Sequence, residues 1–225
     1  MQIREKMARI TQVDTCMVDL VPKVRRADAV QSLVSPQTPL VTINHGVRDT
    51  GQTCTIGTAG PAVISLLRET LVPQLIGRKA AESERIWRDL LVSTRATAEG
   101  AITALALAAI DTALWDLRCK RAGLSGPRSR SASRNWRRMR PALPPPQPCR
   151  LRLAKAGMRP ASPPDDRRAS ACSIVRVDVA RVGGIAPGLT VAHRAEVTNI
   201  PVWPHFRMDL PVSLVCAILN SRMLE

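Results

Sequence analysis

Alternating polar and apolar positions predict β-strands in the first quarter of the chain. Residues 9–20 alternate loosely and predict one strand. Residues 39–45 and 52–56 are rich in β-branched side chains, and Asp49-Thr50-Gly51 between them is typical of a hairpin turn. The segment 23–38 is basic, then polar with a proline, and it predicts a loop.

Helical spacing of apolar residues takes over after Gly60. Pro61 suits a first helical turn, because the N–H that proline lacks would have no partner there. This first helix is predicted to end at Pro73, and a second to begin near Ser83. A third helix, 99–121, is apolar on nearly all sides, which predicts burial against several neighbours at once.

A strand–helix–strand unit is predicted between Ile174 and Phe206. Runs of β-branched residues at 174–182 and 200–204 flank a helix at 187–198. Strands connected in this way are parallel. A further apolar run at 214–218 predicts a third strand.

Two residues of this unit can do acid–base chemistry. Asp178 lies on the first strand and His205 follows the second, and adjacent strands lie about 5 Å apart. The two side chains can therefore share a hydrogen bond in which the carboxylate raises the basicity of the imidazole. Taken singly, a strand-end cap for Asp178 and a core position for His205 are the simpler interpretations.

The order of motifs resembles a known family. The run from Val177 to Ile185, with its double glycine, followed by Pro204-His205-Phe206, resembles the sixth and seventh barrel strands of the mandelate racemase and muconate lactonizing branch of the enolase superfamily. The segments 66–71, 84–87 and 109–117 resemble helices of the amino-terminal capping domain of that superfamily.

The resemblance implies an α+β capping domain at 1–124, followed by an incomplete (β/α)8 TIM-type barrel fragment at 174–225, with strands like the sixth to eighth. A complete barrel needs about 250 residues, far more than remain after Leu124. We therefore expect a truncated or frame-shifted member of the family. The strand edges and the apolar helix face left uncovered predict low solubility or poor stability.

The segment 125–173 differs from the rest in composition. Residues 125–172 hold 11 Arg, one Lys and nine Pro against two acids, Asp165 and Asp166, and so carry much of the net charge of +15. Three interpretations remain open: a disordered linker, a nucleic-acid-binding arm, and a shifted reading frame. Clustered arginines attract phosphate. However, Trp136 is the one aromatic residue among them, and nucleic acid ranks well behind as a partner.

The activity implied by the resemblance is removal of the proton next to a carboxylate, in a racemase or dehydratase acting on a hydroxy acid or acid sugar. His205 would be base or acid, Asp178 its partner, and Glu225 a hydrogen-bonding group for the substrate carboxylate. The family also uses Mg²⁺, a Lys-x-Lys pair and three carboxylates, for which no matching positions are found here. The alternative is an inactive remnant of such an enzyme.

Composition adds few constraints. No two of the six cysteines form a C-x-x-C pair, so neither zinc nor a redox motif is indicated. The amino terminus has no uninterrupted apolar stretch, and no run approaches the ~20 apolar residues of a membrane span. We expect a cytoplasmic protein with a small-molecule carboxylate substrate if active and no membrane partner. The resemblance leaves a homo-oligomer open, because family members are often oligomers, and the sequence does not decide the oligomeric state.

Overall fold

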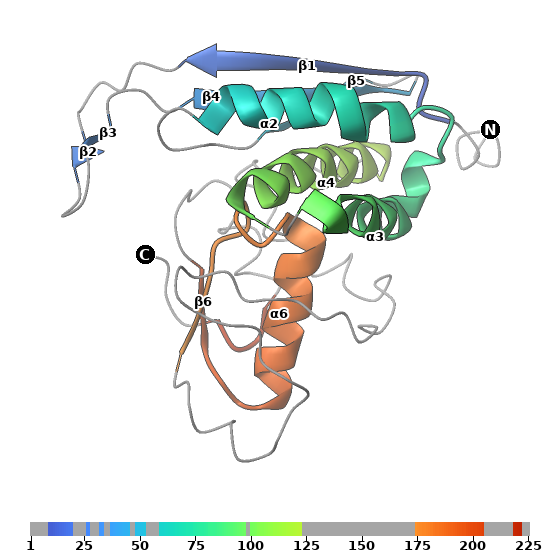
Figure 1. Cartoon of the computed structure of the whole chain (residues 1–225). Helices are drawn as coiled ribbons and strands as arrows, with labels where there is room; N and C mark the ends of the chain where they lie inside the picture. Colours follow the sequence, from blue (N-terminus) through green and yellow to red (C-terminus); the bar gives the residue numbers. More distant parts are fainter. Residues whose placement is uncertain are drawn as a thin grey trace.

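The computed structural model describes residues 9–19, 26–27, 32–33, 37–45, 48–52, 59–97, 100–122, 174–204 and 218–221. Its described elements form three levels (Figure 1): a sheet, a group of helices beneath it, and a strand–helix–strand unit below these helices. Because the predicted linker 125–173 and the residues His205 and Glu225 lie outside the described residues, the expectations for them stay predictions.

The sheet has three antiparallel strands in the order β1 (Gln12–Asp19), β4 (Gln37–Asn44) and β5 (Arg48–Gln52). β4 lies in the centre, and its alternate residues Val41 and Ile43 are fully buried. The predicted hairpin is therefore present, but its turn was placed wrongly. Gly51 pairs with Val41 inside the sheet, so the chain reverses between Asn44 and Arg48 instead.

The segment predicted as a loop, 23–38, contains two short strands. β2 (Arg26–Ala27) and β3 (Ser32–Leu33) pair antiparallel, and β4 already begins at Gln37. Local pairing this short carries no periodic signal in the sequence, which is why the prediction missed it.

The first predicted helix begins where expected but changes type. α2 (Gly60–Leu66) continues into a π-helical turn, η2 (Leu67–Leu71), and a 3-10 turn, η3 (Val72–Gln74). Pro73 cannot donate a backbone hydrogen bond, so the regular helical ladder cannot run through it. A second 3-10 turn, η4 (Ala80–Glu82), leads into α3 (Ser83–Thr94), which begins at the predicted residue and is followed by η5 (Arg95–Thr97).

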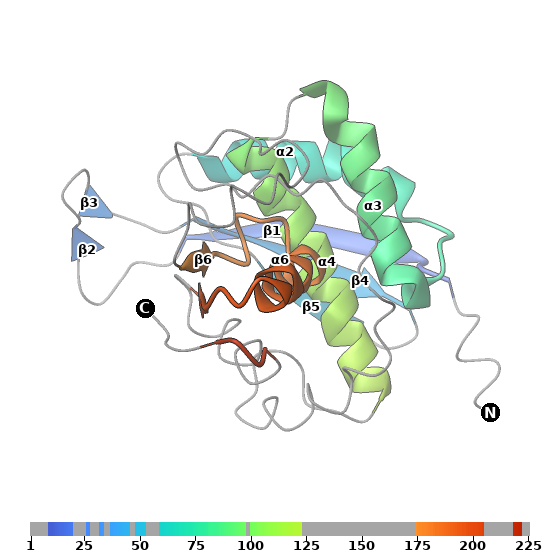
Figure 2. The same cartoon turned by 90° about the horizontal axis from the view of Figure 1, so that it is seen from below.

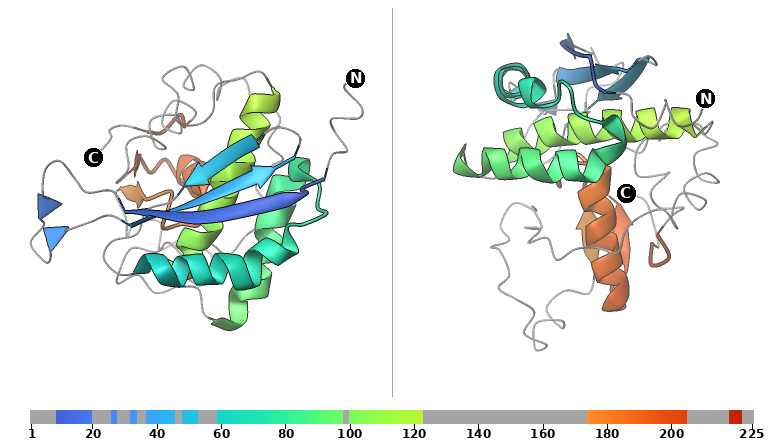
Figure 3. Two further views of the ribbon diagram at one scale, coloured as in Figure 1. Left: turned by 90° about the horizontal axis from the view of Figure 1, so that it is seen from above. Right: turned by 90° about the vertical axis from the view of Figure 1, so that its right-hand side faces the viewer.

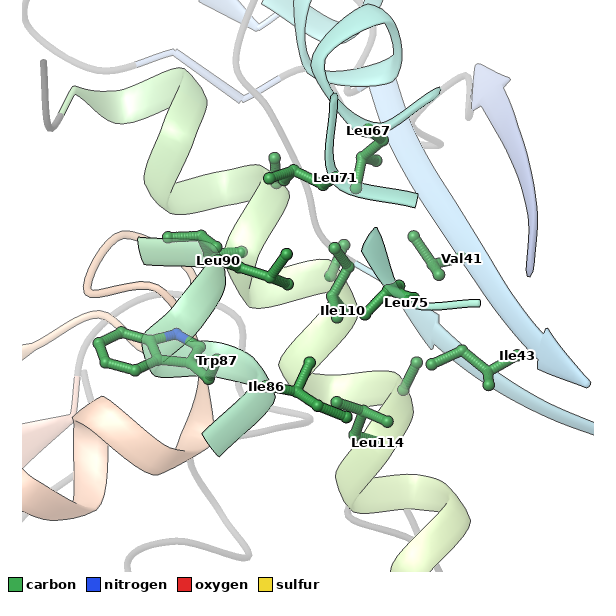
Figure 4. Close-up of a cluster of buried hydrophobic side chains, with 14 of the residues drawn as sticks. Val41, Ile43, Leu67, Leu71, Leu75, Ile86, Trp87, Leu90, Ile110 and Leu114 are labelled. Atoms are coloured by element: carbon green, nitrogen blue, oxygen red, sulfur yellow. The ribbon is translucent and has the colours of Figure 1, made fainter. Parts of the chain in front are cut away.

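The longest helix, α4 (Ala101–Arg121), crosses beneath the sheet (Figure 3). The first hydrophobic core fills the space between the sheet and the helices. Figure 4 shows side chains of β4, α3 and α4 directed toward one another, with Trp87 at the edge of the cluster. Fully buried members of this core include Val41, Ile43, Leu67, Leu71, Leu75, Ile86, Leu90, Ile110 and Leu114.

A second hydrophobic core lies on the other side of α4. Trp115 and Cys119 of α4 pack there with residues of β6 (Val175–Val177), α6 (Ile185–Val197) and β7 (Val202–Pro204). In Figure 2, which views the molecule from below, α6 is seen nearly end-on in front of α4. The prediction that the third helix is buried on several sides is confirmed, because its two faces belong to different cores.

The strand–helix–strand unit differs from the prediction in two details, and a third prediction lies mostly outside the described residues. β6 ends at Val177, so the predicted strand 174–182 is too long by a turn that occupies 178–184. α6 begins at Ile185, two residues before the predicted Pro187. For the predicted strand 214–218, the described part of the chain shows only a parallel bridge between Ser221 and Val202, and 214–217 lie outside it.

Candidate active site

Asp178 is the first residue after β6, and its carboxylate organises the turn that follows. Oδ1 accepts hydrogen bonds from the backbone N–H groups of Ala180 (3.0 Å) and Arg181 (3.2 Å). Oδ2 lies 3.5 Å from Nε of Arg181, and 13% of the Asp178 side chain is exposed. The carboxylate is therefore held in one orientation while it remains partly accessible to solvent.

The two strands of the unit are neighbours and run parallel, as the sequence predicted. Val175 pairs with Val202, and Val177 pairs with Pro204. Asp178 and His205 are the next residues along the two strands in the sequence. His205 lies outside the described residues, so the hydrogen bond between these side chains stays a prediction, as does the role of Glu225.

The turn after Asp178 depends on two glycines with positive φ angles. Gly183 has φ of 95° and Gly184 has φ of 127°, values that residues with a side chain rarely adopt. Gly184 donates its N–H to the carbonyl of Val179 (2.8 Å), which closes the turn. The indole N–H of Trp87, on α3, donates to the carbonyl of Gly183 at 2.7 Å. A residue of the upper helices therefore holds the turn from outside.

Asp111, in the middle of α4, holds the start of α6. Its Oδ2 accepts the backbone N–H of Ala186 at 3.0 Å, and the Ile185 N–H also bonds to the carboxyl. Gly184, the residue before α6, has no side chain that could cap these donors. Asp111 thus acts as the helix cap, although it lies more than seventy residues away in the chain.

Burial sets the protonation of this carboxyl. The Asp111 side chain is fully enclosed, and this burial raises its pKa to about 7. The hydrogen bonds from Ala186 and Ile185 oppose the rise, and the nearby Glu84 carboxyl adds to it. Glu84 on α3 is itself half-buried, which raises its pKa, while the charge of Arg118 opposes that shift.

Sequence reasoning missed Asp111 and Trp87 as residues that shape the site. One signal was present: a carboxyl group at the centre of a helix that is apolar on nearly all sides must find a partner inside the protein. The sequence could not show that this partner is the backbone of residues 185–186.

The other two histidines of the chain, for which the sequence predicts no role, lie within the described residues. His45 is buried, and Nη2 of Arg121 lies 3.1 and 3.0 Å from its two ring nitrogens. His193 lies half-buried on α6.

The described residues contain no cluster of metal-ligating side chains. Among them, no three His, Cys, Asp or Glu side chains gather closely enough to hold a metal ion. Mg²⁺ prefers near-octahedral oxygen coordination, often with one or two protein carboxylates. Asp165 and Asp166 lie outside the described residues.

The described chain also contains no helix that is both long and apolar enough to cross a membrane. What it does contain is a capping sheet-and-helix unit joined to a parallel strand–helix–strand unit that has an acidic residue at a strand end.

The chain belongs to the mandelate racemase / muconate lactonizing enzyme family. The family's N-terminal domain matches residues 8–126, and an enolase C-terminal domain-like model matches residues 167–224. The resemblance inferred from the sequence is therefore confirmed.

Relatives that match in sequence are acid-sugar dehydratases. A D-mannonate dehydratase of Rhizorhabdus wittichii is 46% identical over 63 residues, which are 28% of this chain and 15% of the relative. A D-galactonate dehydratase family member of Marinomonas sp. is 32% identical over 106 residues, 45% of this chain and 25% of the relative. The matched segments thus span a quarter or less of these relatives' own length.

Solved structures share the fold at low identity. A racemase from Streptomyces coelicolor A3(2) with bound magnesium matches with a TM-score of 0.73 and 17% identity, over 96% of this chain and 89% of that one. An L-talarate dehydratase from Polaromonas sp. JS666, complexed with Mg and L-glucarate, matches with a TM-score of 0.72 and 18% identity, over 96% and 87%.

Proposed function

We propose that this chain carries the proton-transfer part of an acid-sugar dehydratase or racemase, with His205 as base or acid and Asp178 as its orienting partner. The observation that supports this most is the register of the parallel strands. Val177 pairs with Pro204, so the residue that follows each of them is the member of the proposed pair.

The proposed step is removal of the substrate α-proton by His205. The imidazole of His205 takes the proton from the carbon next to the substrate carboxylate, and the electron pair of that C–H bond moves into an enediolate. In a racemase a second base on the opposite face, which the family resemblance assigns to the Lys-x-Lys pair, would deliver a proton to that face. In a dehydratase the neighbouring hydroxyl leaves, with a proton, as water. Glu225 would hydrogen-bond the substrate carboxylate, as the family resemblance implies.

Asp178 is suited to the orienting role because its own position is fixed. Two backbone N–H groups and the guanidinium of Arg181 hold the carboxylate at the strand end. An anchored carboxylate next to an imidazole selects the tautomer and favours the protonated form of the ring. The same contacts fit the simpler interpretation of Asp178 as a turn-forming residue, and the test below separates the two.

The test measures exchange of the substrate α-proton in deuterated water by NMR. D-mannonate and L-glucarate are the probes, because proteins similar to this chain act on the first and bind the second. We expect exchange above the buffer rate with one of them and its loss in His205→Asn and Asp178→Asn. The matched control is His193→Asn on α6, which should leave exchange unchanged. If His193→Asn and His205→Asn behave alike, the proposed pair is not catalytic.

An inactive remnant is the second candidate, and the composition of the basic segment favours it. Residues 125–173 contain two acids, adjacent in sequence, where the family resemblance calls for carboxylates on separate strands. A remnant predicts no proton exchange, no heat of Mg²⁺ binding by calorimetry and non-cooperative melting. Sequencing the coding DNA from codon 120 to codon 176 and translating all three frames tests its origin. A restored Lys-x-Lys strand in another frame would identify a damaged copy.

A further inference from the structure

The Asp178 loop, defined as residues 178–184, and the first turn of α6 that follows it are each bound to one of the helices under the sheet. The indole N–H of Trp87 on α3 reaches the carbonyl of Gly183. The carboxyl of Asp111 on α4 caps the first turn of α6, directly after the loop. Both contacts join residues that are at least 75 positions apart in the sequence.

We propose that Trp87 and Asp111 are positioning residues that fix the Asp178 loop, and with it the strand end that carries Asp178, to the capping helices. Insofar as Asp178 is the orienting residue, this inference rests on the proposed function. The attachment itself is independent of that function and can be measured without any activity.

The Asp111 carboxyl suits the N-terminus of α6 in both its chemistry and the space it occupies. A helix N-terminus presents unpaired N–H groups and a partial positive charge, both of which an acidic oxygen satisfies. A Cβ atom on Gly184 would lie 2.4 Å from Oδ2 of Asp111, so only glycine lets the loop come this close. Gly184 has no side chain with which to cap α6, and this lack of a side chain leaves room for the Asp111 carboxyl of α4 to do so.

The contact of Trp87 fixes the other side of the same turn. A Cβ atom on Gly183 would lie 3.5 Å from the indole ring, an ordinary packing distance. The ring therefore covers the loop while its N–H bonds to the loop carbonyl. In Figure 4, Trp87 lies at the edge of the first core, on the side of the strand–helix–strand unit, which is drawn in faint orange.

The attachment should depend on pH because Asp111 changes environment when the loop detaches. Attached, the carboxyl has a pKa of about 7; exposed to water it would return toward 3.8. Asp111 therefore binds its proton more strongly when the loop is attached than when it is detached. A rise in pH consequently favours detachment of the loop. The Glu84 carboxyl on α3 faces Asp111, and its pKa is raised as well. Arg118 of α4 faces Glu84.

The loop side carries its own ionised groups. Asp178 and Arg181 pair with each other, and the first turn of α6 contains no acidic residue. We therefore assign the pH dependence to Asp111, with Glu84 as the second titrating group.

The test is hydrogen exchange of the full chain, read at the amides of Gly184 and Ala186 and corrected for the intrinsic effect of pH. From the two pKa values, the opening constant of the loop should rise roughly 20-fold between pH 5.5 and pH 7.5. Asp111→Asn should abolish most of this rise, because an amide does not titrate. The matched control Asp116→Asn, on the same helix but paired with Lys120, should keep it.

Trp87→Phe provides a second variant that does not touch the carboxyl. It removes the hydrogen bond to Gly183 and should raise the opening constant by about tenfold at both pH values. Amides in the middle of α4 report whether a variant is folded at all. The inference is overturned if Asp111→Asn keeps the pH dependence, or if Trp87→Phe leaves loop exchange unchanged.

Measuring enzymatic activity in the same variants separates this inference from the proposed function. If His205→Asn abolishes proton exchange while Trp87→Phe leaves kcat and its pH profile unchanged, the positioning role is wrong and the proposed function stands. If the loop opens as expected but the wild-type chain shows no proton exchange, the attachment is real and the proposed function fails.

Discussion

Replacing Gly184 with alanine is the most demanding single test of the loop geometry. Gly184 has φ of 127° and ψ of −170°, a region that is almost exclusive to glycine. The added Cβ would lie 2.4 Å from Oδ2 and 2.6 Å from Cβ of Asp111. The variant therefore combines a backbone penalty with a clash that a flexible side-chain tip alone cannot relieve.

Two other glycines separate these costs. Gly77 has φ of 79° with no atom within 4 Å of its Cβ position, and Gly183 has φ of 95° with only ordinary contacts to Trp87. Alanine at either position should cost about 1–2 kcal/mol from the backbone alone. Gly184→Ala should cost about 3–5 kcal/mol, because overpacking adds about 1–3 kcal/mol to the strain.

Urea denaturation followed by tryptophan fluorescence measures this series. The reasoning requires Gly184→Ala to lose clearly more free energy of unfolding than either control. If Gly184→Ala costs no more than Gly77→Ala, then Asp111 does not approach the loop as described, and the capping contact must be abandoned.

Three further predictions use the same measurement. Leu114→Ala should lower the free energy of unfolding by about 2–5 kcal/mol, because Leu114 is fully buried; a loss below 1 kcal/mol would contradict that burial. Lys120→Ala should cost at most about 0.5 kcal/mol, since its ion pair with Asp116 is a partly exposed i,i+4 pair. Because folded Asp111 keeps its proton up to about pH 7, stability should fall as pH rises from about 4 to 7, by at most about 4 kcal/mol. A flat profile, or an unchanged slope in Asp111→Asn, would refute this assignment.

Elements whose pattern is local and long could be predicted from the sequence. α3 and α4 have helical spacing over more than ten residues, and the parallel pair β6–β7 follows from the strand–helix–strand order. The β4–β5 hairpin was predicted with the wrong turn. Asp49-Thr50-Gly51 is turn-like in composition, yet pairing across the sheet placed it within β5.

The end of β6 shows why the site could be predicted only in part. Val179, Ala180 and Val182 continue the apolar character of the strand, and they are indeed buried. The chain nevertheless turns at Asp178, because that carboxylate takes up two backbone N–H groups and because α3 and α4 bind the loop. Contacts across such sequence separations leave no periodic signal near the residues that they shape.

The all-round apolar character of α4 and the single buried carboxyl within it have one explanation. One face of α4 completes the core under the sheet, and the other supplies Trp115 and Cys119 to the core of the strand–helix–strand unit. The described part of this unit, two short strands and one helix, has little apolar surface to bury by itself. Its hydrophobic core therefore depends on packing against α4. Asp111 adds hydrogen bonds, which are directional, to this packing. A change on the Trp115 and Cys119 face of α4 should consequently disturb the strand–helix–strand unit that carries Asp178.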